Sequence, residues 1–257
     1  MHRIARYMTV LLAALLLCFH AYSQEYQPYL SQDDVVNSLQ FLPPPPQPGS
    51  VAFLADEYAY FEAKKLRGTP RGDQAVIDAV MDDTVLLQFE QSFGLKITKE
   101  TLPQTYELLM RSKECFGSSG CNKAKEGYQR TRPFVYYGEP TLTPDDEPFL
   151  LVNYSYPSGH SANFMGLALI LASLHPERQT EIFMRGRDGG YSRAIVGAHW
   201  LSDIQAGQNI AALVFARLQS CKEYREQFQK AQKELQPLLY PDCSCDRPRH
   251  KNKKTRK

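Results

Sequence analysis

The 257-residue sequence has a single long hydrophobic run, and that run lies at its N-terminus. No second run of about 18 apolar residues follows, which excludes a multi-span membrane enzyme. Alternation of apolar and polar residues is scarce, which excludes a protein built mainly of β-sheet. Cysteines, histidines and carboxylates nowhere have the spacing of metal ligands, so we expect neither a metal nor another cofactor.

The N-terminal run is typical of a secretory signal peptide. Arg3 and Arg6 precede a short apolar stretch, and Ala21 and Ser23 have the spacing of a cleavage site. We therefore expect residues 1–23 to be removed. The mature protein is expected to be soluble, in the periplasm or secreted.

An exported compartment permits disulfides among the five cysteines of the mature chain. The odd number leaves at least one thiol without an intramolecular partner. A bridge between Cys115 and Cys121 would close a small loop, and Cys221 could pair with Cys243 or Cys245.

The ends of the mature chain differ in composition from its centre. Residues 24–50 include four consecutive prolines and predict an extended arm that packs on the body or on a second subunit. Residues 241–257 contain a Cys-x-Cys and end in twelve residues with seven basic and one acidic side chain. This tail is predicted to be disordered and could touch anionic envelope surfaces, without specific nucleic-acid recognition.

Helical periodicity runs through residues 51–240 and predicts one compact all-α domain of nine or ten helices. A long loop is expected over 133–156, and a turn at Gly189-Gly190. The first expected helix starts at Val51, and another carries His199. We expect the remaining helices over 73–81, 85–93, 101–110, 123–132, 161–174, 177–185 and 223–235.

Two pairs of residues could hold an oxyanion through cationic side chains. Lys125 and Arg132 are seven residues apart, which is two turns of the predicted helix and places both on one face. Ser192 and Arg193 combine a hydroxyl donor with a guanidinium suited to bidentate contact. Either pair alone is also typical of a solvated basic surface.

The tetrapeptide Pro157-Ser158-Gly159-His160 directly precedes an apolar predicted helix. A helix start offers unpaired N–H groups and a partial positive charge, and Gly159 would let an oxyanion approach the backbone. Ser158 adds a hydroxyl, and His160 would face the same anion. An ordinary serine N-cap followed by a surface histidine is the alternative.

His199 and Asp203 are four residues apart, so they would stack on one helical face. Asp203 could then bind one imidazole nitrogen and leave the other free for nucleophilic or acid/base chemistry. A structural pair inside a packed helix has the same spacing. Arg193 does not share a helical face with His199, so the helix must begin late or bend near Gly197 if both reach one ligand.

Three motifs, K-x6-R-P, P-S-G-H and S-R-x5-H-x3-D, occur in that order over 125–133, 157–160 and 192–203. With them the chain resembles the type 2 phosphatidic acid phosphatase superfamily, and more closely its secreted branch, the bacterial class A non-specific acid phosphatases. The flanks Leu54-Ala55-Asp56, Gly68-Thr69-Pro70-Arg71 and Gly197-Ala198-His199-Trp200 also resemble that branch. The resemblance covers about residues 50–220 and implies the fold of the acid phosphatases and vanadium-dependent haloperoxidases.

The resemblance implies that His199 attacks phosphorus to form a phosphohistidine, with Asp203 fixing its tautomer. His160 would protonate the leaving group and then activate water. The phosphoryl oxygens would be held by Lys125, Arg132, Ser158, Gly159, Ser192 and Arg193. Small phosphate monoesters would be hydrolysed with broad specificity, without a metal and at acid pH, by a homo-oligomer; phosphotransfer to alcohols would use the same intermediate.

Two alternatives use the same pocket differently. A vanadium-dependent haloperoxidase would hold vanadate there, although this chain is shorter than expected for such enzymes. A non-catalytic phosphate-binding envelope protein would need the cations and amides, but not two histidines and Asp203.

Overall fold

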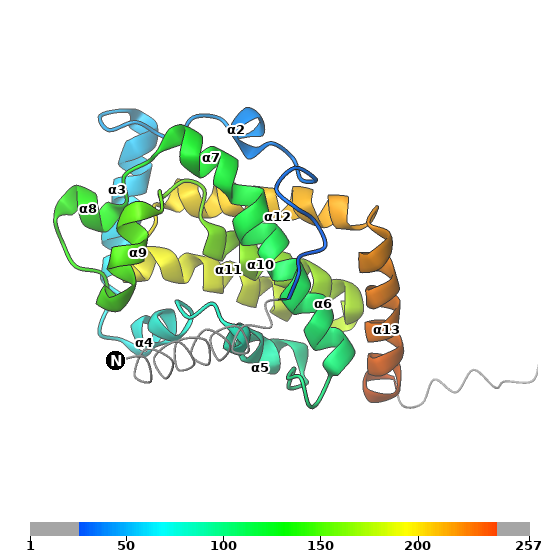
Figure 1. Cartoon of the computed structure of the whole chain (residues 1–257). Helices are drawn as coiled ribbons and strands as arrows, with labels where there is room; N and C mark the ends of the chain where they lie inside the picture. Colours follow the sequence, from blue (N-terminus) through cyan, green and yellow to red (C-terminus); the bar gives the residue numbers. More distant parts are fainter. Residues whose placement is uncertain (1–25, 241–257) are drawn as a thin grey trace, which may run out of the picture.

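The computed structural model describes residues 26–240, which form an all-α fold (Figure 1). Within this range there are twelve α-helices, three short 3₁₀ helices and one π-helical turn, and no strand. The predicted all-α class is therefore confirmed. The predicted signal peptide and the basic tail lie outside the described residues. None of the described helices is both long and apolar enough to cross a bilayer.

Three long helices form the centre of the domain: α10 (Gly159–Leu174), α11 (Gln179–Val196) and α12 (Leu201–Leu218). α10 packs against both of the others, and its side chains are buried on nearly every side. A helix that is apolar all round must be enclosed by other elements. α6 (Pro103–Glu114) and α13 (Lys222–Leu239) pack together at one end of the molecule (Figure 1).

Shorter elements surround the three central helices. They are α2 (Ser38–Phe41), α3 (Val51–Lys64), α4 (Pro70–Ile77), η1 (Asp83–Phe89), α5 (Glu90–Phe93), η2 (Cys115–Ser119), α7 (Gly120–Tyr128), α8 (Pro133–Tyr137), η3 (Pro144–Asp146), α9 (Glu147–Val152) and η4 (Pro176–Arg178).

The predicted loop over 133–156 is wrong, because it contains α8, η3 and α9. Pro133 opens α8 instead of closing the preceding helix. The missing N–H of a proline costs nothing in the first turn of a helix. α8 lies beside α3, where Tyr137 stacks on Tyr60 with ring centroids 4.8 Å apart (Figure 1).

The predicted turn at Gly189-Gly190 is also wrong, since both glycines lie inside α11. A Cβ on Gly189 would come within 2.3 Å of the Phe164 ring, and one on Gly190 within 2.6 Å of Ser161 Oγ. Both neighbours belong to α10. The glycines therefore allow α10 and α11 to pack closely, and the predicted helix 177–185 continues unbroken to Val196.

The N-terminus of α6 (Pro103–Glu114) is capped by a residue of another helix. The N-cap is Leu102, which makes no side-chain capping bond. Glu234 of α13 instead accepts from the N–H groups of Gln104 and Thr105, at 3.0 and 2.9 Å. A carboxylate 129 residues away in the sequence thus caps this helix.

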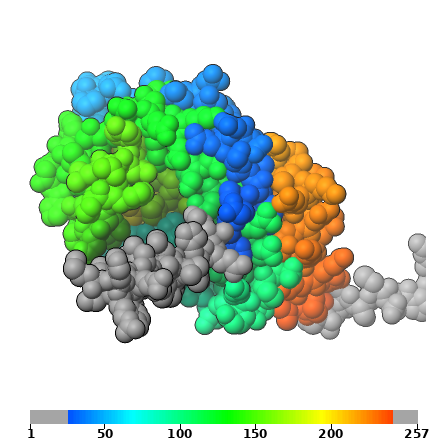
Figure 2. All heavy atoms as spheres, in the orientation of Figure 1, coloured from blue at the N-terminus to red at the C-terminus, as the bar shows by residue number. Residues whose placement is uncertain are grey.

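The described part of the proline-rich arm packs on the body of the same chain. Leu42 is buried, and its carbonyl accepts from Tyr128 Oη at 2.7 Å. Tyr156 Oη donates to the carbonyl of Pro43 at 3.0 Å. Figure 2 shows this N-terminal segment, in blue, lying over the green surface to which α7 belongs. Of the two positions expected for the arm, the structure shows the first.

Cys115, Cys121 and Cys221 carry free thiols, so the predicted Cys115–Cys121 bridge is absent. The Cys115 thiol faces the arm and accepts from Leu30 N at 3.3 Å, whereas Cys121 is enclosed beside the Phe116 carbonyl. Burial raises the pKa of Cys121 to about 12. The proposed partners of Cys221, Cys243 and Cys245, lie outside the described residues.

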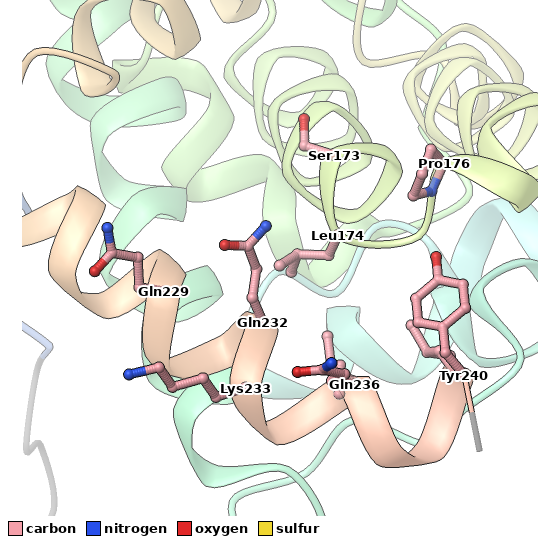
Figure 3. Close-up of a pocket in the computed structure, with 10 residues that line it drawn as sticks. Ser173, Leu174, Pro176, Gln229, Gln232, Lys233, Gln236 and Tyr240 are labelled. Atoms are coloured by element: carbon pink, nitrogen blue, oxygen red, sulfur yellow. The ribbon is translucent and has the colours of Figure 1, made fainter. Parts of the chain in front are cut away.

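A hollow of about 520 Å³ lies between the C-terminal end of α10 and α13 (Figure 3). Lys233 and Gln236 of α13 line it with the C-cap residue Tyr240, and Ser173 and Leu174 of α10 line its other side. It contains no histidine and only one cationic side chain. The candidate catalytic residues gather at the other end of α10, about 24 Å away for a helix of 16 residues.

Candidate active site

The predicted catalytic groups meet where α10 and α12 begin and where α7 and α11 end. They surround a hollow of about 230 Å³, which we call the catalytic hollow. Its lining includes Lys125, Arg132, Gly159, His160 and His199. Residues from all three sequence motifs therefore converge on one space.

Arg132 reaches the catalytic hollow from a loop and not from a helix. α7 ends at Tyr128, and Gln129 adopts a left-handed conformation with φ of 49°. The predicted helix 123–132 is thus too long, and the argument that Lys125 and Arg132 share a helical face is wrong. Hydrogen bonds to backbone carbonyls hold the Arg132 side chain instead, and its NH1 group donates to the Ala198 carbonyl at 3.0 Å.

His199 lies just before α12, in the turn that follows α11. Gly197, with φ of 94°, ends α11, and the N–H of His199 donates to the Arg193 carbonyl at 3.2 Å. The expected bend near Gly197 is present, because only glycine readily adopts this backbone conformation. It brings His199 back toward the last turn of α11.

The contact between His199 and Asp203 also arises differently from the predicted helical stacking. Trp200 is the N-cap of α12, and Asp203, in its first turn, accepts from the Trp200 N–H at 2.8 Å. The same oxygen, Oδ2, lies 3.4 Å from His199 Nδ1. The carboxylate that caps α12 therefore also contacts the histidine that precedes the N-cap residue.

Asp203 has further partners that the sequence motifs do not include. Ser155 Oγ donates to Oδ2 at 2.5 Å, and Arg130 NH1 donates to Oδ1 at 2.5 Å. Asp203 is completely buried. These bonds fix the carboxylate from both sides, so it can hold His199 in one orientation.

Arg130 links this carboxylate to a second one. Its NH2 group lies 2.7 Å from Asp56 Oδ2, and its NH1 group donates to Ser202 Oγ at 2.7 Å. Ser202 in turn donates its N–H and hydroxyl to Asp56, at 2.8 and 2.6 Å. Arg130 is therefore a buried cation with two carboxylate partners. The only signals in the sequence were its place inside K-x6-R and the family-like flank that contains Asp56.

Lys125 and Arg132 have only neutral partners. Lys125 Nζ donates to the Tyr154 carbonyl, and Arg132 donates to the carbonyls of Leu150, Asn153 and Tyr154. Neither makes an ion pair with a carboxylate of the described residues. Burial, with the neighbouring cations, lowers the pKa of Lys125 to about 7 and that of Arg132 to about 9.

Arg193 has no hydrogen-bond partner for Nε, NH1 or NH2 among the described residues, although its exposed fraction is 0%. Burial lowers its pKa to about 10, which still leaves the guanidinium charged at acid and neutral pH. A buried, unpartnered charge is costly, and such a group in a native structure requires an explanation. A binding site for an anionic ligand would provide such an explanation.

The pKa of both histidines is lowered, which favours their neutral forms. Burial, and then the charges of Arg132, Lys125 and Arg193, lower the pKa of His199 well below its usual value. His199 Nε2 lies 2.9 Å from Arg132 NH1. Burial and the charge of Arg193 likewise lower the pKa of His160, whose Nε2 lies 3.0 Å from the Ala79 carbonyl.

The remaining predicted oxyanion donors, Ser158, Gly159 and Ser192, do not all lie at the catalytic hollow. Gly159 lines the catalytic hollow, and Ser158 is the buried N-cap of α10, accepting from Ser161 N at 3.3 Å. Ser192 is not brought to the hollow. It donates its hydroxyl to Asp78 Oδ2 at 2.5 Å and accepts from Arg71 NH2 at 3.0 Å. Within the described residues, no three His, Cys, Asp or Glu side chains are grouped to bind a metal.

Comparison with known proteins identifies the family of the chain. Residues 109–227 match the PAP2 superfamily. A non-specific acid phosphatase of Providencia stuartii is 41% identical over 211 residues, covering 82% of this chain and 85% of that protein. One of Salmonella typhimurium is 38% identical, covering 90% and 92%, and an acid phosphatase of Zymomonas mobilis is 32% identical, covering 88% and 86%. The chain belongs to the class A non-specific acid phosphatases of the PAP2 superfamily.

Proposed function

We propose that this acid phosphatase hydrolyses phosphate monoesters through a covalent phosphohistidine on His199. The proposal is supported by a buried imidazole with a lowered pKa near three buried cations that make no ion pair with a carboxylate of the described residues. Phosphoryl transfer needs mainly positioning and positive charge around the phosphoryl oxygens. Lys125, Arg132 and Arg193 would supply that charge.

In the first step, the lone pair of His199 Nε2 forms the P–N bond while the P–O bond to the leaving group breaks. Nδ1–H faces Asp203, so the Nε2 lone pair points away from that carboxylate and toward the cations. His160 gives its proton to the leaving alkoxide. The products are a phosphohistidine, a neutral His160 and a free alcohol.

In the second step, His160 removes a proton from water, whose oxygen attacks phosphorus and breaks the P–N bond. Inorganic phosphate leaves, and His160 is again protonated. In the free site burial and the nearby cations lower the pKa of His160, which favours its neutral form, but a bound phosphate dianion would raise that pKa. Substrate binding would thus charge the acid, while His199 stays free to attack at acid pH.

Rapid chemical quench of the enzyme with a ³²P-labelled aryl phosphate tests the intermediate. The expected result is a protein-bound label that survives alkali and is released by acid, as a phosphoramidate requires. His199→Ala should lose it and lower kcat by about four orders of magnitude or more. His175→Ala is the matched control, because that histidine caps a different part of the chain through Phe93. A label that resists acid would contradict the proposal.

We also propose that the protein forms a homo-oligomer through α3. Val51, Leu54, Tyr58 and Phe61 form an apolar stripe along this helix, yet their exposed fractions range from 47% to 85%. A stripe repeating every three and four residues is typical of a helix that packs on another helix. Light scattering should show an oligomer that Leu54→Glu with Tyr58→Glu dissociates. A parent protein that is monomeric at every concentration would contradict this.

Export is the last part of the proposal and rests on residues 1–23. Mass spectrometry of protein from the periplasm or medium should find an N-terminus at Gln24. Retention of the full-length chain in the cytoplasm would contradict it.

A further inference from the structure

A second hollow of about 560 Å³ adjoins the catalytic hollow. Met81, Phe149, Leu150 and His160 line both spaces. The shared residues include His160, which faces the leaving group in the proposed mechanism. An ester held by its phosphate in the catalytic hollow could therefore extend its organic part into the second space.

The walls of this second hollow are largely apolar. Val76, Val80 and Phe149 line it and are large hydrophobic side chains left exposed, Phe149 by 63%. Leu142 and Leu150 complete the wall. Its volume lies within the range of ordinary small-molecule sites, about 300–1,000 Å³. An apolar space beside a catalytic acid fits an organic group better than a second phosphate.

Charges at the two ends of this hollow are opposite. At its inner end is Arg193, completely buried and without a partner among the described residues. Three acidic residues, Asp82, Asp145 and Asp146, also line it, and Asp82 and Asp145 are exposed. The charge of Asp146 partly offsets the effect of burial on Arg193. An occupant should therefore place its anionic end at Arg193 and a neutral or cationic end among the aspartates.

We propose that this second hollow, here called the leaving-group hollow, selects phosphate esters whose organic part is apolar and is neutral or positively charged, against esters with a further negative charge. The inference rests on the proposed function, because it concerns the leaving group of that reaction. Specificity is then a difference in free energy between substrates, set by repulsion as much as by contact.

The part of the catalytic hollow whose lining residues are not shared with the second hollow is the competing location for the organic part. It is lined by Lys113, Glu114 and Ser118. Glu114 lies 3.3 Å from Lys113 and accepts from Ser118 Oγ at 3.1 Å, so its charge is already balanced. This part offers neither an apolar wall nor a net charge that would discriminate between leaving groups.

Three aryl phosphates that differ only in one charge test the inference: phenyl phosphate, 4-carboxyphenyl phosphate and 4-(aminomethyl)phenyl phosphate. Rates should be measured at pH 6, where free carboxylates are ionised and the amine is protonated. We expect kcat/KM to rank the aminomethyl ester first and the carboxyl ester last, with about a tenfold span. Equal values for the three esters would overturn the inference. No hydrolysis of any ester would instead overturn the proposed function.

The double variant Asp82→Asn with Asp145→Asn should reduce the span to about twofold while phenyl phosphate is still hydrolysed. Asparagine at position 82 keeps the oxygen that accepts from Thr84 N, so η1 retains its cap. Glu114→Gln is the matched control in the unshared part of the catalytic hollow and should leave the span unchanged. A reduced span in Glu114→Gln, with no change in the double variant, would overturn the assignment of the leaving group to this hollow.

Discussion

Arg130 and Arg193 are both buried within the same active-site region, but they differ in what surrounds them. Arg130 lies 2.5 Å from Asp203 and 2.7 Å from Asp56, and it also donates to Ser202. Arg193 has no hydrogen-bond partner among the described residues. One guanidinium is therefore neutralised by the protein itself, whereas the other makes no such bond, as the proposed binding of a phosphoryl group requires.

This difference divides the site into two parts with different tasks. The part around Asp203 is fully hydrogen-bonded, so it holds His199 without offering charge to a substrate. The part around Arg193 contains buried cations that make no ion pair with a carboxylate of the described residues. Preorganised charge that awaits the reacting group is the usual source of electrostatic catalysis. A substitution in the part around Arg193 should therefore lower activity, and a substitution in the part around Asp203 should lower stability.

Arg193→Met should give the largest loss of activity without loss of stability. We expect kcat/KM to fall by about 10³-fold, because a donor to the phosphoryl oxygens is removed. The free energy of unfolding should stay constant or increase, since a buried, unpaired charge is replaced by an apolar side chain. Steady-state kinetics and urea unfolding measure the two effects. Strong destabilisation would show that Arg193 is structural.

Arg130→Met should show the reverse, with a large loss of stability. Two buried carboxylates would lose their cation, which typically destabilises a protein by about 3–5 kcal/mol. Arg187→Met is a control, since Arg187 pairs with Asp188 at the surface and should change stability by less than about 1 kcal/mol. If the free energy of unfolding of Arg130→Met equals that of the parent, the paired arginine contributes nothing to stability. The proposed difference between Arg130 and Arg193 would then be wrong.

Lys125→Met should have a smaller effect that depends on pH. The pKa of Lys125 is about 7 in the free site, so the side chain is charged below this pH and loses its charge as pH rises. In the parent, KM should rise above about pH 7. The variant should have about 10²-fold lower kcat/KM at pH 5 and a flatter alkaline limb. If the variant loses activity above pH 7 as steeply as the parent does, that loss would have to come from the titration of another group.

Chelation should have the smallest effect. If the cationic side chains supply the charge, activity after dialysis against EDTA should stay within about twofold of the untreated enzyme. Added Mg²⁺ or Zn²⁺ should not increase it. Complete loss, restored by a divalent ion, would contradict the metal-independent mechanism.

The helical class could be predicted from the sequence because apolar periodicity is a local property. The apolar helix 161–174 corresponds to α10, since its composition requires burial whatever its neighbours are. Helix boundaries that depend on contacts with residues far away in the sequence could not be predicted. Gly189 and Gly190 looked like a turn, but their lack of side chains serves the close approach of α10.

Most of the candidate site could be predicted because the three motifs name its residues, although not their geometry. His199 and Arg132 reach the hollow from turns, which helical spacing did not indicate. Arg130 could not be found in this way. Its partner Asp56 is 74 residues away, and a charged residue in the sequence gives no sign that it will be buried and paired.

The most direct test of the central claim is the binding of inorganic phosphate to the two arginine variants, measured as a shift in Tm at pH 6. Phosphate that binds only the folded protein must stabilise it. We predict that saturating phosphate raises the Tm of the parent and of any folded Arg130→Met protein by several degrees, and leaves that of Arg193→Met unchanged. An equal shift in the parent and in Arg193→Met would contradict the account.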